Sequence, residues 1–261
     1  MSFVTTHIHD RKQRVNPHNK HMHLYLLIGQ SNMAGRGRVE PQDKETHPRV
    51  YTFDATDRWI PAVDPLHFDK PIAGVGPGLT FGKRMAASAP LAVIGLIPCA
   101  AGGSPITAWR PGAYWHQTDS HPYDIAIRRT RLAQQDGVLK GILWHQGESD
   151  ANQKDANRYL ERLADLIHGL RSDLDAKVPF VCATLGDFFV TRNQWASTIN
   201  DALKQMPTQV SRAACVPATG LCHNGDELHF SAQAAHELGK RYAEAILRLH
   251  QSSQQSTASH T

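Results

Sequence analysis

The feature that most constrains the fold of this chain is the repeated alternation of short apolar runs with longer segments of helical periodicity. The apolar runs are nearly continuous, as expected of strands covered on both faces, and comprise residues 24–28, 91–98, 139–144, 179–185 and 213–217. Apolar residues recur with a helical period in residues 78–89, 122–136, 155–171, 193–206 and 231–249. A strand followed by a helix, repeated along the chain, predicts an α/β domain with a parallel sheet in a three-layer α/β/α sandwich.

The length of the chain indicates one domain. A chain of 261 residues, 41% of them hydrophobic, is long enough for one substantial core, and we expect this domain over residues 21–250. Residues 1–20 are polar and lack apolar periodicity, so they are predicted to form a flexible N-terminal arm. Residues 251–261 are rich in Ser and Gln and are predicted to be a disordered tail. Residues 37–77, rich in Pro, Asp and Gly, are expected to wrap around the surface.

Charge and hydropathy argue against nucleic acids and membranes as partners. The formal net charge is +4, but basic and acidic residues are interspersed, so a nucleic-acid surface is not indicated. No segment reaches the roughly 18 apolar residues that a membrane span needs. The polar N-terminus lacks the apolar core of a secretory signal, which predicts a cytoplasmic protein, or a secreted one if a leader was removed. The oligomeric state is left open.

Four cysteines are too few for a disulfide framework, which fits a reducing compartment. Cys215 and Cys222 are close enough in sequence for a bridge, and that question is also left open.

Ligands of open parallel sheets bind beyond the carboxyl ends of the strands, so the loops that follow each predicted strand are the places to search. The first strand is followed by GQSNMAGRG, in which Ser31 has the position of a nucleophile at the start of new structure. The alternative is that Ser31 caps a helix. A phosphate loop is disfavoured, because the Lys and Ser/Thr of a Walker motif are missing.

The next two loops offer hydrogen-bond donors. After the second strand comes a Gly102-Gly103 pair, whose uncovered backbone N–H groups can approach a substrate oxygen closely, although such pairs are often only tight turns. After the third strand comes HQGESD, in which the amide of Gln146 can stabilise an oxyanion without carrying charge. A loop held by its own polar groups is the alternative.

The loop before the last helix contains a carboxylate and an imidazole three residues apart. Asp226 can accept the Nδ1–H of His229 and leave Nε2 free to take a proton. The alternatives are a surface histidine, or a metal site in which His229 joins Cys215, Cys222 and His223. The spacing of a zinc motif is absent, so no metal ligand is predicted.

The blocks GQSNMAGRG, AGGS, HQGESD and DELHFS, taken in this order, resemble the SGNH hydrolases. The resemblance is to the branch that contains carbohydrate esterase family 6 and the sialate O-acetylesterase-like proteins. It implies a flavodoxin-like sandwich with five parallel strands and a Ser-His-Asp mechanism that needs no cofactor.

Carried over to this chain, the resemblance implies that Ser31 is the nucleophile, His229 the base and Asp226 the residue that orients it. The oxyanion donors would be the N–H groups of Ser31 and Gly103 and the side chain of Gln146. The broader SGNH pattern has Asn where this sequence has Gln146, which points to the carbohydrate-esterase branch. Glu148 in the same loop is an alternative partner for His229.

The implied substrate is an acetyl ester of a small carbohydrate or an oligosaccharide, such as acetylated xylan or an acetylated sialic acid. Trp109 and Arg110, with the nearby Tyr114 and Trp115, are expected to bind the sugar. The alternative is that these aromatic residues anchor their loop onto the domain. Two other hypotheses stay open. One is a metal-dependent hydrolase that uses the His-rich regions, including His21 and His23, and the other is a non-catalytic carbohydrate-binding module on the same fold.

Overall fold

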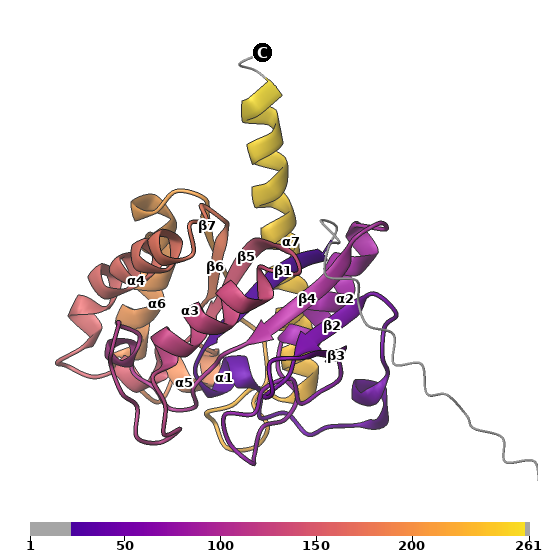
Figure 1. Ribbon diagram of the computed structural model, residues 1–261. Helices are drawn as coiled ribbons and strands as arrows, with labels where there is room; N and C mark the ends of the chain where they lie inside the picture. The colour runs from indigo at the N-terminus through magenta and orange to yellow at the C-terminus, as the bar shows by residue number, and fades with distance from the viewer. Residues whose placement is uncertain (1–21, 259–261) are drawn as a thin grey trace, which may run out of the picture.

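The computed structural model describes residues 22–258 (Figure 1). Over this range seven strands form one sheet, in the order β3-β2-β4-β1-β5-β6-β7. All neighbouring strands are parallel except β3, which runs antiparallel to β2. The bounds of the strands are β1 (Met22–Gly29), β2 (Val50–Phe53), β3 (Trp59–Pro61), β4 (Val93–Pro98), β5 (Val138–His145), β6 (Phe180–Ala183) and β7 (Ala213–Val216).

Helices cover both faces of this sheet (Figure 1). The helices are α1 (Ser31–Ala34), α2 (Gly78–Ser88), α3 (Pro122–Ala133), α4 (Tyr159–Asp173), α5 (Asp187–Val190), α6 (Ala196–Gln209) and α7 (Ala232–Ala258). Short 3₁₀ turns are η1 (Pro41–Lys44), η2 (Ile106–Ala108), η3 (Glu148–Asp150) and η4 (Ala156–Arg158).

The alternation of side chains along the central strand β1 creates two separate cores. Leu24, Leu26 and Ile28 are fully buried in the core that is shared with α3, α4 and α6. Tyr25 and Leu27 are fully buried in the core that is shared with α2 and α7. Successive residues of a strand point to opposite faces, so a strand between two helical layers must be apolar throughout. This explains the continuous apolar run in the sequence.

The predicted fold class is confirmed, and the strand count differs. The five predicted strands coincide with β1, β4, β5, β6 and β7, and they lie in the order 2-1-3-4-5 of a flavodoxin-like sheet. The sequence did not reveal β2 and β3, which lie inside the segment 37–77 that was expected only to wrap the surface. Both are short, Thr52 interrupts the apolar residues of β2, and β3 contains Pro61, so neither resembles a strand buried on both faces.

The ends of the chain differ from the sequence-based expectations in one respect. The predicted flexible arm of residues 1–20 lies outside the described residues. The predicted disordered tail does not begin at residue 251, because α7 continues to Ala258 and extends beyond the sheet (Figure 1). Adding turns to a formed helix avoids the cost of nucleation, which explains how Ser and Gln residues can continue it. In residues 22–258 no helix is both long enough and apolar enough to cross a bilayer.

The carboxyl ends of β1 and β5 are tied together, and this junction places the loops of the site. The Gln30 N–H donates a hydrogen bond to the His145 carbonyl oxygen over 2.9 Å. Gly29 has φ of +127°, and a Cβ at this position would lie 2.1 Å from the same oxygen. Only glycine fits such a close approach between two backbones. The four cysteines are free, so Cys215 and Cys222 are not bridged.

Candidate active site

Ser31 begins the short helix α1 directly after β1, and its side chain faces the loop that precedes α7. The Ser31 Oγ lies 3.0 Å from Nε2 of His229. The Nδ1 of His229 lies 2.6 Å from Oδ2 of Asp226. These two contacts join residues 198 positions apart in the sequence into one hydrogen-bonded chain of hydroxyl, imidazole and carboxylate. A hydroxyl so placed can lose its proton to the imidazole as it attacks an electrophile.

Asp226 is fixed by its own loop. Its Oδ1 accepts hydrogen bonds from the backbone N–H groups of His229, at 2.8 Å, and Leu228, at 2.9 Å. Partial burial alone would raise the pKa of Asp226, but hydrogen bonds from the backbone and imidazole of His229 and from the Leu228 N–H outweigh it and lower the pKa. Asp226 is therefore a stable anion beside the imidazole.

Glu148, the alternative partner of His229, makes different contacts. Its Oε1 accepts a hydrogen bond from Nδ2 of Asn32 at 2.5 Å. Its side chain is 4% exposed, and burial raises its pKa to about 7 although the Asn32 hydrogen bond opposes this. The structure thus brings His229 to Asp226 and holds Glu148 against Asn32.

Asn32 connects three loops. Besides Glu148, its Nδ2 donates to the carbonyl oxygen of Leu228 over 3.1 Å, and its Oδ1 accepts the N–H of Phe230 over 3.1 Å. Both of these backbone groups flank His229. The residue after Ser31 therefore fixes the backbone on each side of the imidazole, a positioning role that the sequence analysis did not identify.

A cavity of about 340 Å³ opens beside Ser31. It is lined by charged, polar and apolar residues from several loops: Gln30, Ser31, Arg36, Lys70, Ile72, Gly102, Gly103, Gln117, Glu148, Ser149, Phe189, Leu228 and His229. Ligand sites are typically concave and mostly apolar, with a few polar groups that fix orientation. The cavity fits this description.

Two backbone N–H groups at this cavity are available to an oxyanion. Among the described residues, the hydrogen bonds leave the N–H groups of Ser31 and Gly103 unused. The turn that presents Gly103 is held on each side, since the Gly102 N–H donates to Asp69 and the hydroxyl of Ser149 donates to the Gly103 carbonyl oxygen. Gly103 has φ of +76°, where glycine is favoured.

The structure places Gln146 away from this cavity. Its side chain is fully buried, and its Nε2 lies within hydrogen-bond distance of Gln30 Oε1, the Ser104 carbonyl oxygen and Asp150 Oδ2. An amide has only two N–H donors, so these acceptors engage it completely. The expected role of Gln146 as an oxyanion donor does not match this placement. Two of its acceptors, Gln30 and Ser104, lie far from it in sequence, so the HQGESD motif alone could not reveal these hydrogen bonds.

The expected sugar-binding residues also lie elsewhere. Trp109 is 1% exposed, donates its indole N–H to Ser104 Oγ over 2.9 Å, and packs edge-on against Trp144. Arg110 is exposed and donates to the carbonyl oxygen of Thr107. Neither residue lines the cavity beside Ser31. Trp109 is a core side chain that anchors its loop, and the density of aromatic residues in the sequence could not distinguish an anchor from a platform.

Residues that the sequence analysis did not single out line the cavity instead. Arg36 donates to the buried carboxylate of Asp69 at 2.7 Å, so its charge is compensated. The ammonium group of Lys70 lies 2.9 Å from Oε1 of Gln117. Arg36 belongs to the GQSNMAGRG block and was detectable there, whereas nothing in the sequence around Lys70 marks it as part of a site.

The structure gives no support to a metal at His229. Residues 22–258 contain one cluster of three metal-ligating side chains, namely Asp43, Asp64 and His236, and it includes neither His229 nor the cysteines. His223 points back into its own loop, where its Nδ1 accepts the N–H of Gly225 over 3.0 Å. His21, which the metal-dependent alternative uses, lies outside the described residues.

Comparisons with known proteins agree on the type of family. Residues 21–248 match the family model described as carbohydrate esterase, sialic acid-specific acetylesterase. The chain is 32% identical over 246 residues to a probable carbohydrate esterase of Arabidopsis thaliana, covering 86% of this chain and 90% of that protein.

Solved structures show the same fold. An Arabidopsis thaliana protein superposes with a TM-score of 0.77 at 31% identity, covering 87% of this chain and 98% of that one. The protein NanS superposes with a TM-score of 0.75 at 19% identity, covering 89% and 98%. A carbohydrate acetylesterase of Xanthomonas citri gives a TM-score of 0.69 at 19% identity, covering 87% and 56%.

The raised pKa of Glu148 predicts a pH-dependent difference in stability from a Glu148→Gln variant. The buried carboxyl group holds its proton up to about pH 7 in the folded state, against 4.5 for an ordinary glutamate. The wild type should therefore lose stability relative to the variant as the pH rises between these values, by about 3 kcal/mol in total. Urea unfolding of both proteins across this range measures the difference.

The exposed Glu161 on α4 supplies the control. A Glu161→Gln variant, at an exposed position, should differ only slightly from the wild type in stability. If the stability curves of the wild type and Glu148→Gln run parallel, burial of Glu148 does not control its ionisation.

Proposed function

This chain belongs to the carbohydrate esterase family of sialic acid-specific acetylesterases, and from this premise we propose that it removes acetyl groups from carbohydrates by a Ser31-His229-Asp226 mechanism. One observation carries the proposal. Ser31 Oγ lies 3.0 Å from His229 Nε2, and His229 Nδ1 lies 2.6 Å from Asp226 Oδ2. The three groups form a continuous hydrogen-bonded chain beside a cavity.

In the first step, His229 accepts the Ser31 proton at Nε2 while Oγ attacks the ester carbonyl carbon. Asp226 accepts the Nδ1–H of His229, so the lone pair of the neutral imidazole faces Ser31. The imidazolium that forms carries a positive charge, which the Asp226 carboxylate stabilises. The low pKa of Asp226 keeps this carboxylate ionised.

The charge that develops on the carbonyl oxygen is stabilised by the N–H groups of Ser31 and Gly103. The tetrahedral intermediate then collapses to an acetyl-enzyme, and His229 gives its proton to the departing sugar hydroxyl. In the second step, His229 takes a proton from a water molecule, which attacks the acetyl-enzyme and releases acetate. His229 then returns this proton to Ser31 Oγ. Gln146 is a positioning residue in this scheme. Its amide hydrogen-bonds Gln30, the neighbour of Ser31, and Asp150, and so holds both loops in place.

The cavity favours an acetylated sugar that carries a carboxylate, such as a sialic acid, over a neutral xylan. The Arg36 guanidinium is already paired with Asp69, but within the part of the chain that the structure describes Lys70 has only the neutral amide of Gln117 as its hydrogen-bond partner. An ammonium group with a neutral partner can bind a substrate carboxylate. Ile72, Phe189 and Leu228 supply the apolar part of the lining.

The wild-type protein is expected to hydrolyse an aryl acetate, and Ser31→Ala should abolish this activity because it removes the nucleophile. A chelator should leave the initial rate unchanged. Release of the aryl alcohol measures both results. Chelator sensitivity together with an active Ser31→Ala variant would instead indicate a metal-dependent hydrolase. If the folded wild type turns over no ester, the binding-module hypothesis holds.

Asp226→Asn should lower kcat by about 10³ to 10⁴, because an amide donates to Nδ1 and so stabilises the wrong tautomer of His229. Glu148→Gln should cost only about tenfold, because the amide oxygen still accepts the Asn32 hydrogen bond. Steady-state kinetics with the aryl acetate measure both. Near-normal kcat in Asp226→Asn beside a strong loss in Glu148→Gln would transfer the role to Glu148.

Lys70→Met keeps the length of the side chain and removes its charge. We expect kcat/KM for an acetylated sialic acid to fall about tenfold, since a charge-assisted hydrogen bond is lost. The rate on an uncharged aryl acetate should stay within about twofold. Lys204→Met, at an exposed lysine on α6, is the matched control. Equal effects of Lys70→Met on acetylated sialic acid and acetylated xylo-oligosaccharide would contradict the choice of an acidic sugar.

A further inference from the structure

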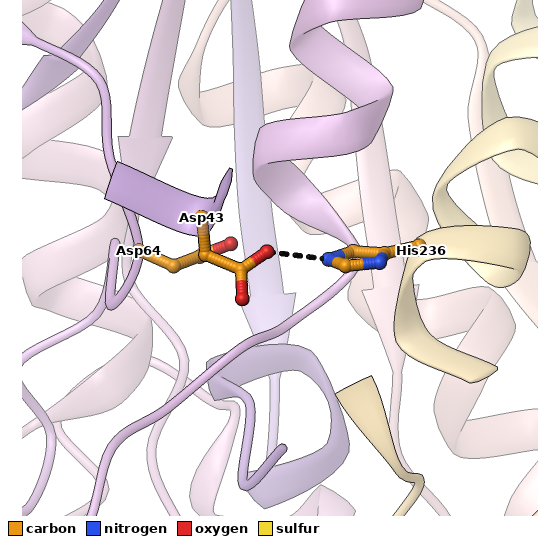
Figure 2. A group of neighbouring side chains, drawn as sticks. All are labelled: Asp43, Asp64 and His236. Atoms are coloured by element: carbon orange, nitrogen blue, oxygen red, sulfur yellow. Dashed lines mark hydrogen bonds and ion pairs between the residues drawn. The ribbon is translucent and has the colours of Figure 1, made fainter. Parts of the chain in front are cut away.

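A second cluster of chemically active side chains lies outside the cavity beside Ser31. Asp43 of η1, Asp64 of the loop after β3 and His236 of α7 converge from three separate segments of the chain (Figure 2). Asp43 is 3% exposed and Asp64 is 1% exposed, whereas the side chain of His236 is 28% exposed. The cluster therefore has a buried carboxyl side and a more open imidazole side.

The geometry of the cluster suits one shared ion. One ligand atom from each side chain lies within 4.8 Å of the other two. The Nε2 of His236 is 2.8 Å from Oδ1 of Asp43 (Figure 2). The second oxygen of Asp43 accepts the N–H of Glu40 at 2.8 Å, which fixes the carboxylate. The Asp64 N–H donates to the carbonyl oxygen of Asp43 at 3.0 Å, so the two loops are already joined.

An independent observation points to a missing cationic partner. Neither carboxylate oxygen of Asp64 has a hydrogen-bond partner among the described residues, although both atoms are buried. An unpaired carboxylate in the interior is costly. The backbone N–H groups of Gly76 and Leu66 lie near this carboxyl group, but neither makes a hydrogen bond of normal geometry to it. A cation bound between the three side chains would give the Asp64 oxygens the close partner that they lack among the described residues.

We propose that Asp43, Asp64 and His236 form a structural site for one divalent cation, with Zn²⁺ as the best-matched ion. Zinc binds imidazole nitrogen and carboxylate oxygen at about 2.0 to 2.2 Å, usually with four ligands. Three protein ligands leave one position for water. Two carboxylates and a neutral imidazole balance the charge of the ion, and the unpaired Asp64 oxygens gain a partner.

The ligand atoms are close to the spacing that coordination needs. Two atoms bound to one tetrahedral ion at these distances lie about 3.3 to 3.6 Å apart, so the most widely spaced side chains must move by up to about 1 Å. His236 would exchange its hydrogen bond to Asp43 for a bond to the ion. His236 also borders a second cavity of about 410 Å³ next to Glu237 and Lys240, which gives the ion a route from solvent.

The site would act on the stability of the fold and not on the reaction. It ties the segment 37–77 to the start of α7. None of its three ligands lines the cavity beside Ser31. Zinc should therefore raise the melting temperature without changing the initial rate of the esterase.

The test is zinc binding by the chelator-treated full-length protein. We expect the wild type to bind one zinc ion per chain. The variants Asp64→Asn and His236→Gln should each bind zinc at least about tenfold more weakly and lose the ion on dialysis. At a hundredfold excess over the dissociation constant, Zn²⁺ should raise the wild-type Tm by at least about 5 °C, and Mg²⁺ should not. Metal analysis after dialysis and thermal unfolding measure these results.

Other histidines in this chain also attract zinc, so a control variant is needed. His168 on α4 is exposed and outside the cluster, and His168→Gln should respond to Zn²⁺ like the wild type. Asp64→Asn removes the unpaired carboxylate, so without zinc it should be at least as stable as the wild type. If it fails to fold, His236→Gln at the partly exposed position decides the question.

Equal zinc responses in the wild type and both cluster variants would overturn the proposal, as would no response in any of them. A Tm that rises with Mg²⁺ and not with Zn²⁺ would overturn the assignment to zinc. Because the aryl acetate assay with Ser31→Ala does not depend on this cluster, failure of the zinc site and failure of the esterase mechanism are distinguishable.

Discussion

The site depends on the side-chain amide of Asn32. Ser31 follows the first described strand and His229 precedes the last described helix, so non-covalent contacts must hold the two residues together. Asn32 uses both N–H donors and its carbonyl oxygen for this, with Glu148 and Leu228 as acceptors and Phe230 as donor. A buried polar group whose partners are all satisfied specifies one arrangement, because any alternative leaves several groups unpaired.

Two carboxyl groups near Ser31 have opposite environments, and this separates their chemistry. Asp226 is 42% exposed at its side chain and receives two backbone N–H groups, which favour the anion. Glu148 is enclosed and receives one amide donor, so its proton is lost only near neutral pH. Pairs of titratable groups with divergent pKa values commonly mark different roles at one site. Here the Asp226 carboxylate hydrogen-bonds the His229 imidazole, whereas the Glu148 carboxyl group accepts a hydrogen bond from Asn32 and helps to hold it in place.

The sequence predicted what depends on local pattern and missed what depends on distant contacts. Buried strands were found because their apolar runs are continuous, whereas β3 was missed because it is short and contains Pro61. The geometry of Ser31, Asp226 and His229 could be anticipated because a short motif sets each loop. Gln146 and Trp109 were misjudged because their partners come from elsewhere in the fold: the indole N–H of Trp109 and the amide of Gln146 both contact the residue Ser104.

Helix α7 has a consequence for how the protein is made. It packs against α2, completes one of the two cores, and hydrogen-bonds the end of β5 through Tyr242. It also follows every other described element in the chain. Ser31 is synthesised before His229 and α7, so the part of this core that α7 covers is buried last among the described elements. Until α7 docks, this apolar surface is exposed on the nascent chain and can associate with other chains, and Ser31 has no imidazole beside it.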